Sequence, residues 1–278
     1  MKSKTIVLTG ASDGIGAAAA QILSNHQHQL ILVGRSESKM KRVAEKVKAK
    51  HYFIADYENL SSVIELTEKI LDCCPVIDVL VNNAGGIFSG PTKTSDGFEK
   101  SFQVNHLAPF LLTNLLMDRL IDSHACIVNT SSIGAKLYGK INIEDMNTWQ
   151  DFSPNRAYGN GKLANILFTK ELHNRYHEHG ISTVAFHPGN VATNFASETN
   201  SYFRHVYHSF LKIFLISAQK GGENLVHFIE GMPDKDWESG QFYGSNRKIS
   251  RTNSQAYNNE LIQQHWDKSS EMLGDYLI

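Results

Sequence analysis

The segment that decides the fold is TIVLTGASDGIG, residues 5–16. Its first half is a short β-branched and apolar run, which predicts a buried strand. Its second half places Gly10, Gly14 and Gly16 directly after that strand and at the start of a helical pattern. Glycines here permit a tight turn, close approach of a diphosphate and close helix–strand packing, while the helix N-terminus faces the phosphates. The segment therefore predicts a dinucleotide-binding βα unit; the alternative is a turn with a purely structural role.

Apolar runs of the same kind recur along the chain, and segments with helical periodicity separate them. Nearly every position of each run is apolar, which is typical of parallel strands buried on both faces. We therefore predict an α/β Rossmann fold: a doubly wound parallel seven-stranded sheet with helices on both faces, formed by residues 1–278 as a single domain. The predicted strands are 5–10, 29–34, 51–56, 78–85, 125–132, 181–189 and 240–244, and the predicted helices are 14–25, 36–48, 59–72, 96–120, 155–179 and 218–230.

The composition excludes several classes of protein. Of 278 residues, 41% are hydrophobic and 20% are charged, so we expect a folded core rather than disorder. The formal net charge of −1 speaks against a nucleic-acid-binding protein, which usually has a basic excess. Three cysteines without a CxxC spacing predict neither a disulfide framework nor a metal site, and reduced thiols favour a cytoplasmic location. The first apolar run is too short for a signal peptide or a membrane span, so we expect a soluble intracellular protein.

Several motifs carry a resemblance to a known family. The G-x-x-x-G-x-G spacing of residues 10–16, NNAG (82–85) and HPGNVATNF (187–195) resemble the short-chain dehydrogenase/reductase family. YGNGKLANILFTKELHNRY (158–176) and the tail from Ser239 are similar to its retinol-dehydrogenase-like branch, which includes WW-domain-containing oxidoreductases. The resemblance covers almost the whole chain. It implies an NADP(H)-dependent oxidoreductase that acts on a small, partly apolar aldehyde, ketone or alcohol.

The end of the second predicted strand selects the cofactor. An acid there usually binds the ribose hydroxyls of NAD, but VGRS (33–36) offers Arg35 instead. A guanidinium can pair bidentately with a 2′-phosphate, so we predict that NADP(H) is preferred over NAD(H). The alternative is that Arg35 is a solvated surface charge. After the third strand, the resemblance implies a contact of Asp56 with the adenine; Asp56 could also be a strand-end residue or a helix cap, with Asn59 as a rival cap.

The resemblance assigns a larger cofactor set to the strand ends. Asn83 would line the adenine ribose and support the sheet, and Thr193 with the Val191 backbone would hold the nicotinamide carboxamide. We expect His187 to have a structural or hydrogen-bonding role rather than an acid/base role. The complete predicted cofactor set is Gly10, Ser12, Asp13, Gly14, Ile15, Gly16, Arg35, Asp56, Tyr57, Asn83, Ala84, Gly85, Tyr158, Lys162, Pro188, Gly189, Val191 and Thr193.

A phenol and an ammonium form the predicted catalytic pair. YGNGK places Tyr158 and Lys162 four residues apart, on one helical face. Alone they would be a surface pair, but a strand that ends at Ser132 precedes them, and the three groups converge if the helix packs beside that strand. Reduction of a carbonyl by hydride needs a proton for the developing alkoxide. A nearby ammonium and the positive oxidised nicotinamide would lower the phenol pKa from about 10.

We therefore assign roles to four catalytic residues. Tyr158 donates or accepts the proton, Ser132 holds the carbonyl oxygen, and Lys162 supports the phenol and binds the nicotinamide ribose. The resemblance implies that Asn105 positions a water linking Lys162 to solvent; it could instead cap or kink a buried helix, and Pro109 nearby favours a distortion. Gly159 and Gly161 weaken a helix interior, and the sequence offers no firm reason for them.

The segment 194–216 is dense in aromatic and apolar residues, and we interpret it as a mobile substrate lid. A membrane-contact helix is the rival interpretation. The predicted helices 96–120 and 155–179 would supply the faces of a homodimer or homotetramer, as in many members of the family. Two other functions remain: a catalytically silent NADP-sensing regulatory protein, which would typically lack the Tyr or the Lys, and a sugar-nucleotide epimerase, which usually has a different glycine spacing.

Overall fold

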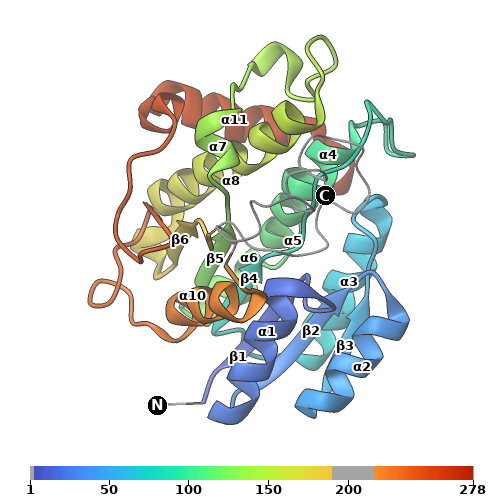
Figure 1. Cartoon of the computed structure of the whole chain (residues 1–278), viewed down its shortest axis with the longest axis vertical. Helices are drawn as coiled ribbons and strands as arrows, with labels where there is room; N and C mark the ends of the chain where they lie inside the picture. Colours follow the sequence, from blue (N-terminus) through green and yellow to red (C-terminus); the bar gives the residue numbers. More distant parts are fainter. Residues whose placement is uncertain (1–2, 190–215, 278) are drawn as a thin grey trace.

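A single parallel sheet organises the molecule. The computed structural model describes residues 3–189 and 216–277. Seven strands pair in the order β3-β2-β1-β4-β5-β6-β7, and every pair is parallel. This confirms the predicted seven-stranded α/β Rossmann architecture (Figure 1). The strands are β1 (Thr5–Thr9), β2 (Gln29–Gly34), β3 (His51–Ile54), β4 (Val79–Asn82), β5 (Cys126–Thr130), β6 (Ser182–Phe186) and β7 (Gln241–Tyr243).

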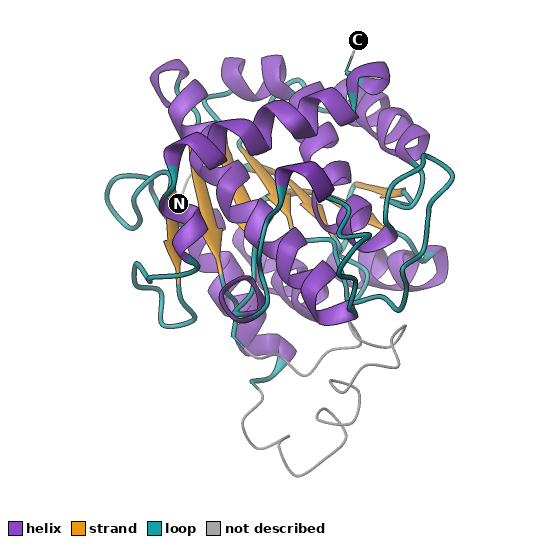
Figure 2. Cartoon of the chain, turned by 90° about the horizontal axis from the view of Figure 1, so that it is seen from above, coloured by secondary structure: helices purple, strands orange, loops and turns teal. Residues whose placement is uncertain are grey.

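Helices cover both faces of the sheet (Figure 2). One core packs the sheet against α1 (Gly14–Leu23), α2 (Glu37–Val47) and α10 (Ala218–Glu230). The other packs it against α3 (Leu60–Cys73), α5 (Ala108–Leu115), α8 (Pro154–Tyr176) and α11 (Asn259–Met272). Shorter helices are α4 (Lys100–Phe102), α6 (Met117–Asp122) and α7 (Gly134–Leu137). Along β1, Val7 belongs to one core while Ile6 and Leu8 belong to the other, because successive strand residues point to opposite faces.

The edge strand β3 departs from the prediction that both faces of every strand are buried. Its burial alternates, and the side chains of Tyr52 and Ile54 are 39% and 40% exposed. The reason is its place in the sheet: β3 ends the strand order and pairs with β2 alone. Continuous apolar character therefore does not separate this edge strand from the central ones.

The helix predicted over 96–120 is divided. Residues Lys100–Phe102 are α-helical, Gln103–Leu107 form a π-helical turn, and α5 then begins at Ala108. The distortion expected near Pro109 exists, but it precedes the proline, which lies in the first turn of α5, where a missing N–H is tolerated. Asn105 lies in the middle of the π turn, a feature often found at functional sites.

The C-terminal helix α11 was not among the predicted helices, and it packs on α8. The Trp266 ring lies 4.9 Å from that of Phe110 and 5.6 Å from that of Phe168, centroid to centroid. Both phenylalanines belong to helices that we expect to form oligomer faces, so part of those faces is occupied by the chain itself. The homodimer or homotetramer stays a prediction.

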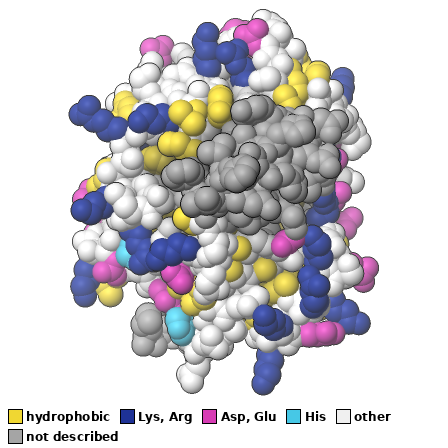
Figure 3. All heavy atoms as spheres, in the orientation of Figure 1, with side chains coloured by type: hydrophobic (Ala, Val, Ile, Leu, Met, Phe, Trp, Pro, Cys, Tyr) yellow, Lys and Arg dark blue, Asp and Glu magenta, His cyan; other side chains and the backbone are white. Residues whose placement is uncertain are grey.

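Two surface properties bear on possible partners. On the face shown in Figure 3, the Lys and Arg side chains are scattered around the molecule rather than gathered in one patch. Within residues 3–189 and 216–277, none of the helices combines the length and the apolar character needed to cross a membrane.

Candidate active site

The carboxyl ends of β1, β4 and β5 are tied together by a polar network around Asn83. The Thr9 hydroxyl donates to the Val81 carbonyl at 3.0 Å and accepts the Asn83 backbone N–H at 3.0 Å. The Asn83 side-chain amide donates to the Thr9 carbonyl at 3.0 Å and accepts from the Thr130 hydroxyl at 3.2 Å. Asn83 therefore supports the edge of the sheet at which ligands of this fold bind.

The glycine-rich turn fits a dinucleotide. Gly10 has φ +66°, and a Cβ there would lie 2.8 Å from Ala84 Cα. A Cβ on Gly16 would lie 2.2 Å from the Gly10 carbonyl oxygen, so neither position can hold a side chain. The N-terminus of α1 opens directly from this turn, with Asp13 as its N-cap. The carboxylate of Asp13 is paired with Lys39 at 2.7 Å, which offsets its charge near the place where phosphates would bind.

Near the carboxyl ends of β2 and β3, charged residues form a connected cluster. The Arg35 guanidinium pairs with Glu58 at 3.0 Å, and Lys100 pairs with the same carboxylate at 2.8 Å. Asp56 follows β3, and its carboxylate accepts the Glu58 backbone N–H at 3.1 Å. The cap of α3 is Asn59, which accepts the Ser61 N–H at 2.9 Å, so Asp56 does not fill that role. The Tyr57 side chain is buried.

The predicted catalytic groups meet at the end of β5. Tyr158 lies on α8 and is hydrogen-bonded to Ser132, which also accepts the Gly134 N–H at 3.1 Å. A Cβ on Gly134 would lie 3.1 Å from the Tyr158 ring, so this glycine leaves room for the phenol. The Lys162 ammonium donates to the Thr130 carbonyl at 3.1 Å and lies 5.8 Å from the centre of the Tyr158 ring. The structure thus brings Ser132, Tyr158 and Lys162 together.

Burial dominates the protonation of the pair. It raises the pKa of the Tyr158 phenol to about 12, opposed by the hydrogen bond with Ser132. It lowers the pKa of the Lys162 ammonium to about 8. The expected lowering of the phenol pKa is therefore not produced by this chain alone, because desolvation of a buried phenolate outweighs the neighbouring groups.

Asn105 holds the loop that follows β4. Its side-chain amide donates to the carbonyls of Gly86 at 2.9 Å and Ser101 at 2.8 Å, and its oxygen accepts the Gly86 N–H at 3.1 Å. A Cβ on Gly85 would lie 2.5 Å from that oxygen and 3.0 Å from the Lys162 ammonium. Asn105 therefore adjoins the site, but both of its side-chain N–H groups are committed to the backbone.

This fold and site coincide with a known sequence family. Residues 4–202 match the family model described as short chain dehydrogenase. The chain belongs to the short-chain dehydrogenase family. It is an oxidoreductase of the class that acts on CH–OH and C=O groups, and it falls in the retinol-dehydrogenase-like branch.

Relatives of this family member span nearly its whole length. A protein of Streptomyces sp. (strain C5), named as a candidate daunorubicin C-13 ketoreductase, is 36% identical to this chain. The match covers 99% of this chain and 94% of that protein. Mouse retinol dehydrogenase 12 is 34% identical to this chain, and the match covers 98% of this chain and 86% of that protein. Among solved structures, a Mycobacterium paratuberculosis protein matches with a TM-score of 0.77 and 28% identity over 98% of this chain and 93% of that one. An NADPH-bound carbonyl reductase from chicken fatty liver matches with a TM-score of 0.68 and 20% identity, over 90% of this chain and 99% of that one.

Two glycines of this dehydrogenase, unexplained by its sequence, are explained by packing. A Cβ on Gly161 would lie 2.9 Å from the Asn105 Cβ, so Gly161 lets α8 pack against the π turn. A Cβ on Gly159 would lie 2.8 Å from the Tyr138 Cβ and 2.9 Å from the Gly134 carbonyl, so Gly159 lets the segment after β5 pack on α8. Both glycines weaken the helix, but they allow α8, the π turn and the segment after β5 to pack closely around Tyr158.

The turn after β6 depends on a residue that the sequence analysis missed. The Asn224 side chain, on α10, donates to the Pro188 carbonyl at 3.0 Å and accepts from Arg247 at 3.1 Å. Gly189 follows with φ +110°. His187 is half-buried, and this burial lowers its pKa to about 4. The predicted residues Val191 and Thr193, and the predicted lid 194–216 apart from Ile216, lie outside the described residues.

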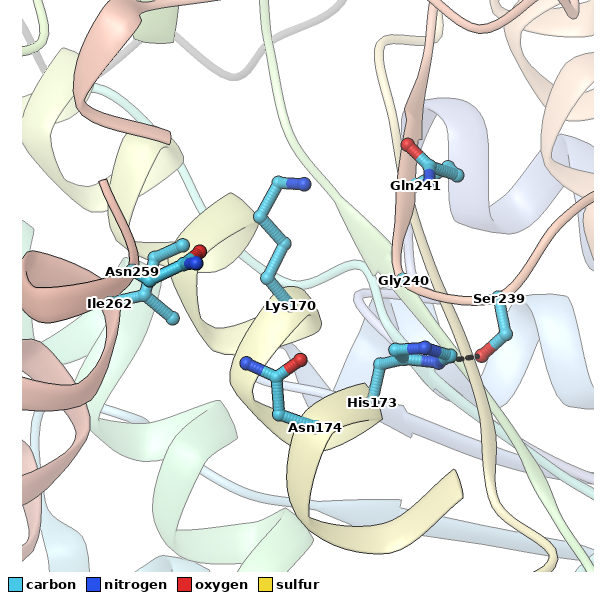
Figure 4. Close-up of a pocket in the computed structure, with 8 residues that line it drawn as sticks. All are labelled: Lys170, His173, Asn174, Ser239, Gly240, Gln241, Asn259 and Ile262. Carbon is cyan, nitrogen blue, oxygen red and sulfur yellow. Dashed lines mark hydrogen bonds between the residues drawn. The ribbon is translucent and has the colours of Figure 1, made fainter. Parts of the chain in front are cut away.

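A cavity of about 210 Å³ lies away from this site, between α8, α11 and the start of β7. Lys170 and His173 project from α8 toward it, and His173 hydrogen-bonds to Ser239 at 2.9 Å (Figure 4). None of the predicted catalytic or cofactor residues lines it, so it is not the dinucleotide site. Its lining is Lys170, His173, Asn174, Ser239, Gly240, Gln241, Asn259 and Ile262.

Proposed function

We propose that this dehydrogenase transfers hydride between NADP(H) and the carbonyl or alcohol carbon of a partly apolar aldehyde, ketone or alcohol, with Tyr158 as proton donor and acceptor. The observation that carries this proposal is the meeting of Ser132, Tyr158 and Lys162 beside a glycine turn that fits a dinucleotide. The glycine turn and the strand-end residues around Asn83 would hold the cofactor. When bound, it supplies the hydride and, once oxidised, a positive ring.

The protonation of the site favours carbonyl reduction at neutral pH. Because the pKa of Tyr158 is raised to about 12, the phenol carries the proton that a developing alkoxide needs. Lys162, with a pKa lowered to about 8, is mostly an ammonium at pH 7 and can stabilise negative charge on the phenol oxygen. Ser132 lies within hydrogen-bonding reach of the same phenol, where it can hold the carbonyl oxygen.

The substrate class is supported from two sides. The names of the relatives refer to retinol, an apolar alcohol, and to a ketone of daunorubicin. In the segment after Ser132, Leu137 is 60% exposed and Tyr138 is 36% exposed, so apolar side chains close in sequence to Ser132 reach the surface. The lid role of 194–216, the absence of membrane contact, the single-domain organisation and the cytoplasmic location stay predictions.

The test is a panel of aldehydes, ketones and alcohols with NADPH and NADH, followed at the nicotinamide absorbance. We expect reduction of at least one apolar aldehyde or ketone, with kcat/KM at least about 10-fold higher for NADPH, as one charge-assisted contact implies. NADPH binding without turnover of any compound would favour the silent sensor instead. Equal use of both cofactors would overturn the NADP(H) preference but not the reductase.

Arg35→Ala tests the cofactor preference directly. We expect the Kd for NADPH to rise about 10- to 100-fold, because a charge-assisted hydrogen bond contributes about 1.5–3 kcal/mol. The Kd for NADH should change less than about 2-fold, since NADH has no 2′-phosphate. Arg42→Ala on the exposed side of α2 is the matched control and should leave both values unchanged. Equal losses for the two cofactors in Arg35→Ala contradict the assignment.

A further inference from the structure

Two histidines and a glutamate meet near the amino end of β2, whereas the catalytic groups lie at the carboxyl ends of the strands. His26 ends a short 3₁₀ turn, His28 lies just before β2, and Glu230 is the last residue of α10. The His26 Nδ1 atom lies 2.5 Å from Glu230 Oε1, and the His28 Nε2 atom lies 3.0 Å from the same oxygen. Gln27 between them is in the left-handed region, with φ +59°, and this turn brings both imidazoles to one carboxylate.

The two imidazoles are the recorded partners of the Glu230 carboxylate. Both ion pairs that the structure records for it are to His26 and His28. The nearby Lys4 ammonium is directed elsewhere: it donates to the main-chain carbonyls of Ile229 at 2.8 Å and Glu230 at 3.3 Å. The carboxylate is only 14% exposed and the His28 side chain 1%, so solvent compensates the charge poorly.

We propose that His26, His28 and Glu230 form a binding site for a divalent transition metal, with Zn²⁺ as the best match. The ligand atoms are His26 Nδ1, His28 Nε2 and Glu230 Oε1, all within 4.8 Å of one another. Zn²⁺ takes imidazole nitrogens and carboxylate oxygens at about 2.0–2.2 Å in tetrahedral geometry, and three protein ligands leave the fourth position to water. Donor atoms of such a site lie about 3.3 Å apart. His26, whose side chain is 37% exposed, is therefore the ligand that has to adjust: its Nδ1 atom must move away from Glu230 Oε1 and toward His28 Nε2.

Metal binding changes the proton arrangement on His28. The Lys4 backbone N–H donates to His28 Nδ1 at 3.2 Å, so in the neutral ring the proton is on Nε2, facing Glu230. The metal takes the Nε2 position and the proton moves to Nδ1, with no net change in the charge of the ring. The hydrogen bond from Lys4 is lost in this exchange. The Lys4 N–H then needs another acceptor.

The bound metal would tie the start of β2 to the end of α10. Helix α10 also carries Asn224, which holds the Pro188 carbonyl after β6. The site is therefore expected to stabilise the protein without entering the reaction, and it does not depend on the proposed function.

Calorimetric titration of the chelator-treated full-length protein with Zn²⁺ tests the proposal. We expect one equivalent to bind with a Kd on the order of micromolar or tighter, and Co²⁺ to give the visible absorption of a tetrahedral site. The unfolding temperature should rise with Zn²⁺, because the metal binds the native state. His26→Gln and Glu230→Gln should each weaken binding at least about 100-fold, more than the loss of an outer-shell partner does.

His179→Gln, at another exposed histidine, is the matched control and should bind Zn²⁺ as the parent does. Circular dichroism and NADPH affinity of each variant establish that it is folded. No saturable Zn²⁺ binding by the parent, or binding retained in either His26→Gln or Glu230→Gln, overturns the proposal. Loss of binding in the control variant places the metal elsewhere and overturns it as well.

Discussion

Tyr158→Phe is expected to lower kcat for carbonyl reduction by at least about 10³-fold, within the range known for a lost general acid. The hydroxyl is removed while the ring, which packs against Gly134, is kept. The fold and the affinity for NADPH should therefore change little, with Kd within about 2-fold. Steady-state turnover and a fluorescence titration with NADPH measure the two quantities on the same preparation.

The matched control for this variant is Tyr52→Phe, which removes a hydroxyl from the exposed edge strand. It should keep the parent's kcat and KM. If Tyr158→Phe retained more than about a tenth of the parent's kcat, the proton would have to come from another group, and the assignment of Tyr158 would fail.

Lys162→Met has the second large effect. Methionine keeps an unbranched side chain of nearly the same length but removes the charge beside the phenol, so we expect kcat/KM to fall about 10²- to 10³-fold, as for a lost electrostatic stabiliser. In the parent, reduction should decline as pH rises through about 8, because Lys162 has a pKa lowered to about 8 and loses its proton there. The variant should lack this decline. Rates measured between pH 6 and pH 10 give both results.

The same substitution has a predictable effect on stability. The pKa of Lys162 is lower in the folded protein than in the unfolded chain, so its charged form opposes folding at every pH below the folded value. As pH rises, this penalty disappears between the folded pKa of about 8 and the ordinary lysine pKa of 10.5. Lys162→Met should therefore be at least as stable as the parent at pH 7, by thermal unfolding.

Lys170→Met is the matched control, since Lys170 lies on the same helix and burial also lowers its pKa, but it lines the cavity away from the catalytic groups. Its turnover should equal that of the parent. A variant Lys162→Met that kept the parent's rate and pH profile would show that the ammonium has no part in the reaction.

The sequence was sufficient where neighbouring residues determine the structure. Short apolar runs and glycine turns are local signals, and all seven predicted strands are present, although several are shorter at their ends. The same logic located Ser132, Tyr158 and Lys162, because the carboxyl ends of parallel strands share one edge of the sheet.

Features that depend on distant partners could not be predicted. Gly161 leaves room for the Asn105 side chain and Gly159 for that of Tyr138. The sequence YGNGK contains no signal for either contact. The support of Pro188 by Asn224 joins residues 36 positions apart. The high phenol pKa is another case, because pairing with a lysine is visible in the sequence whereas the degree of burial is not.

The aromatic contact between α11 and the helices beneath it means that the C-terminal stretch is not a dispensable tail. A truncation before Trp266 would expose the rings of Phe110 and Phe168 and create an apolar surface patch that favours aggregation. Recombinant versions of this enzyme should therefore retain helix α11 in full.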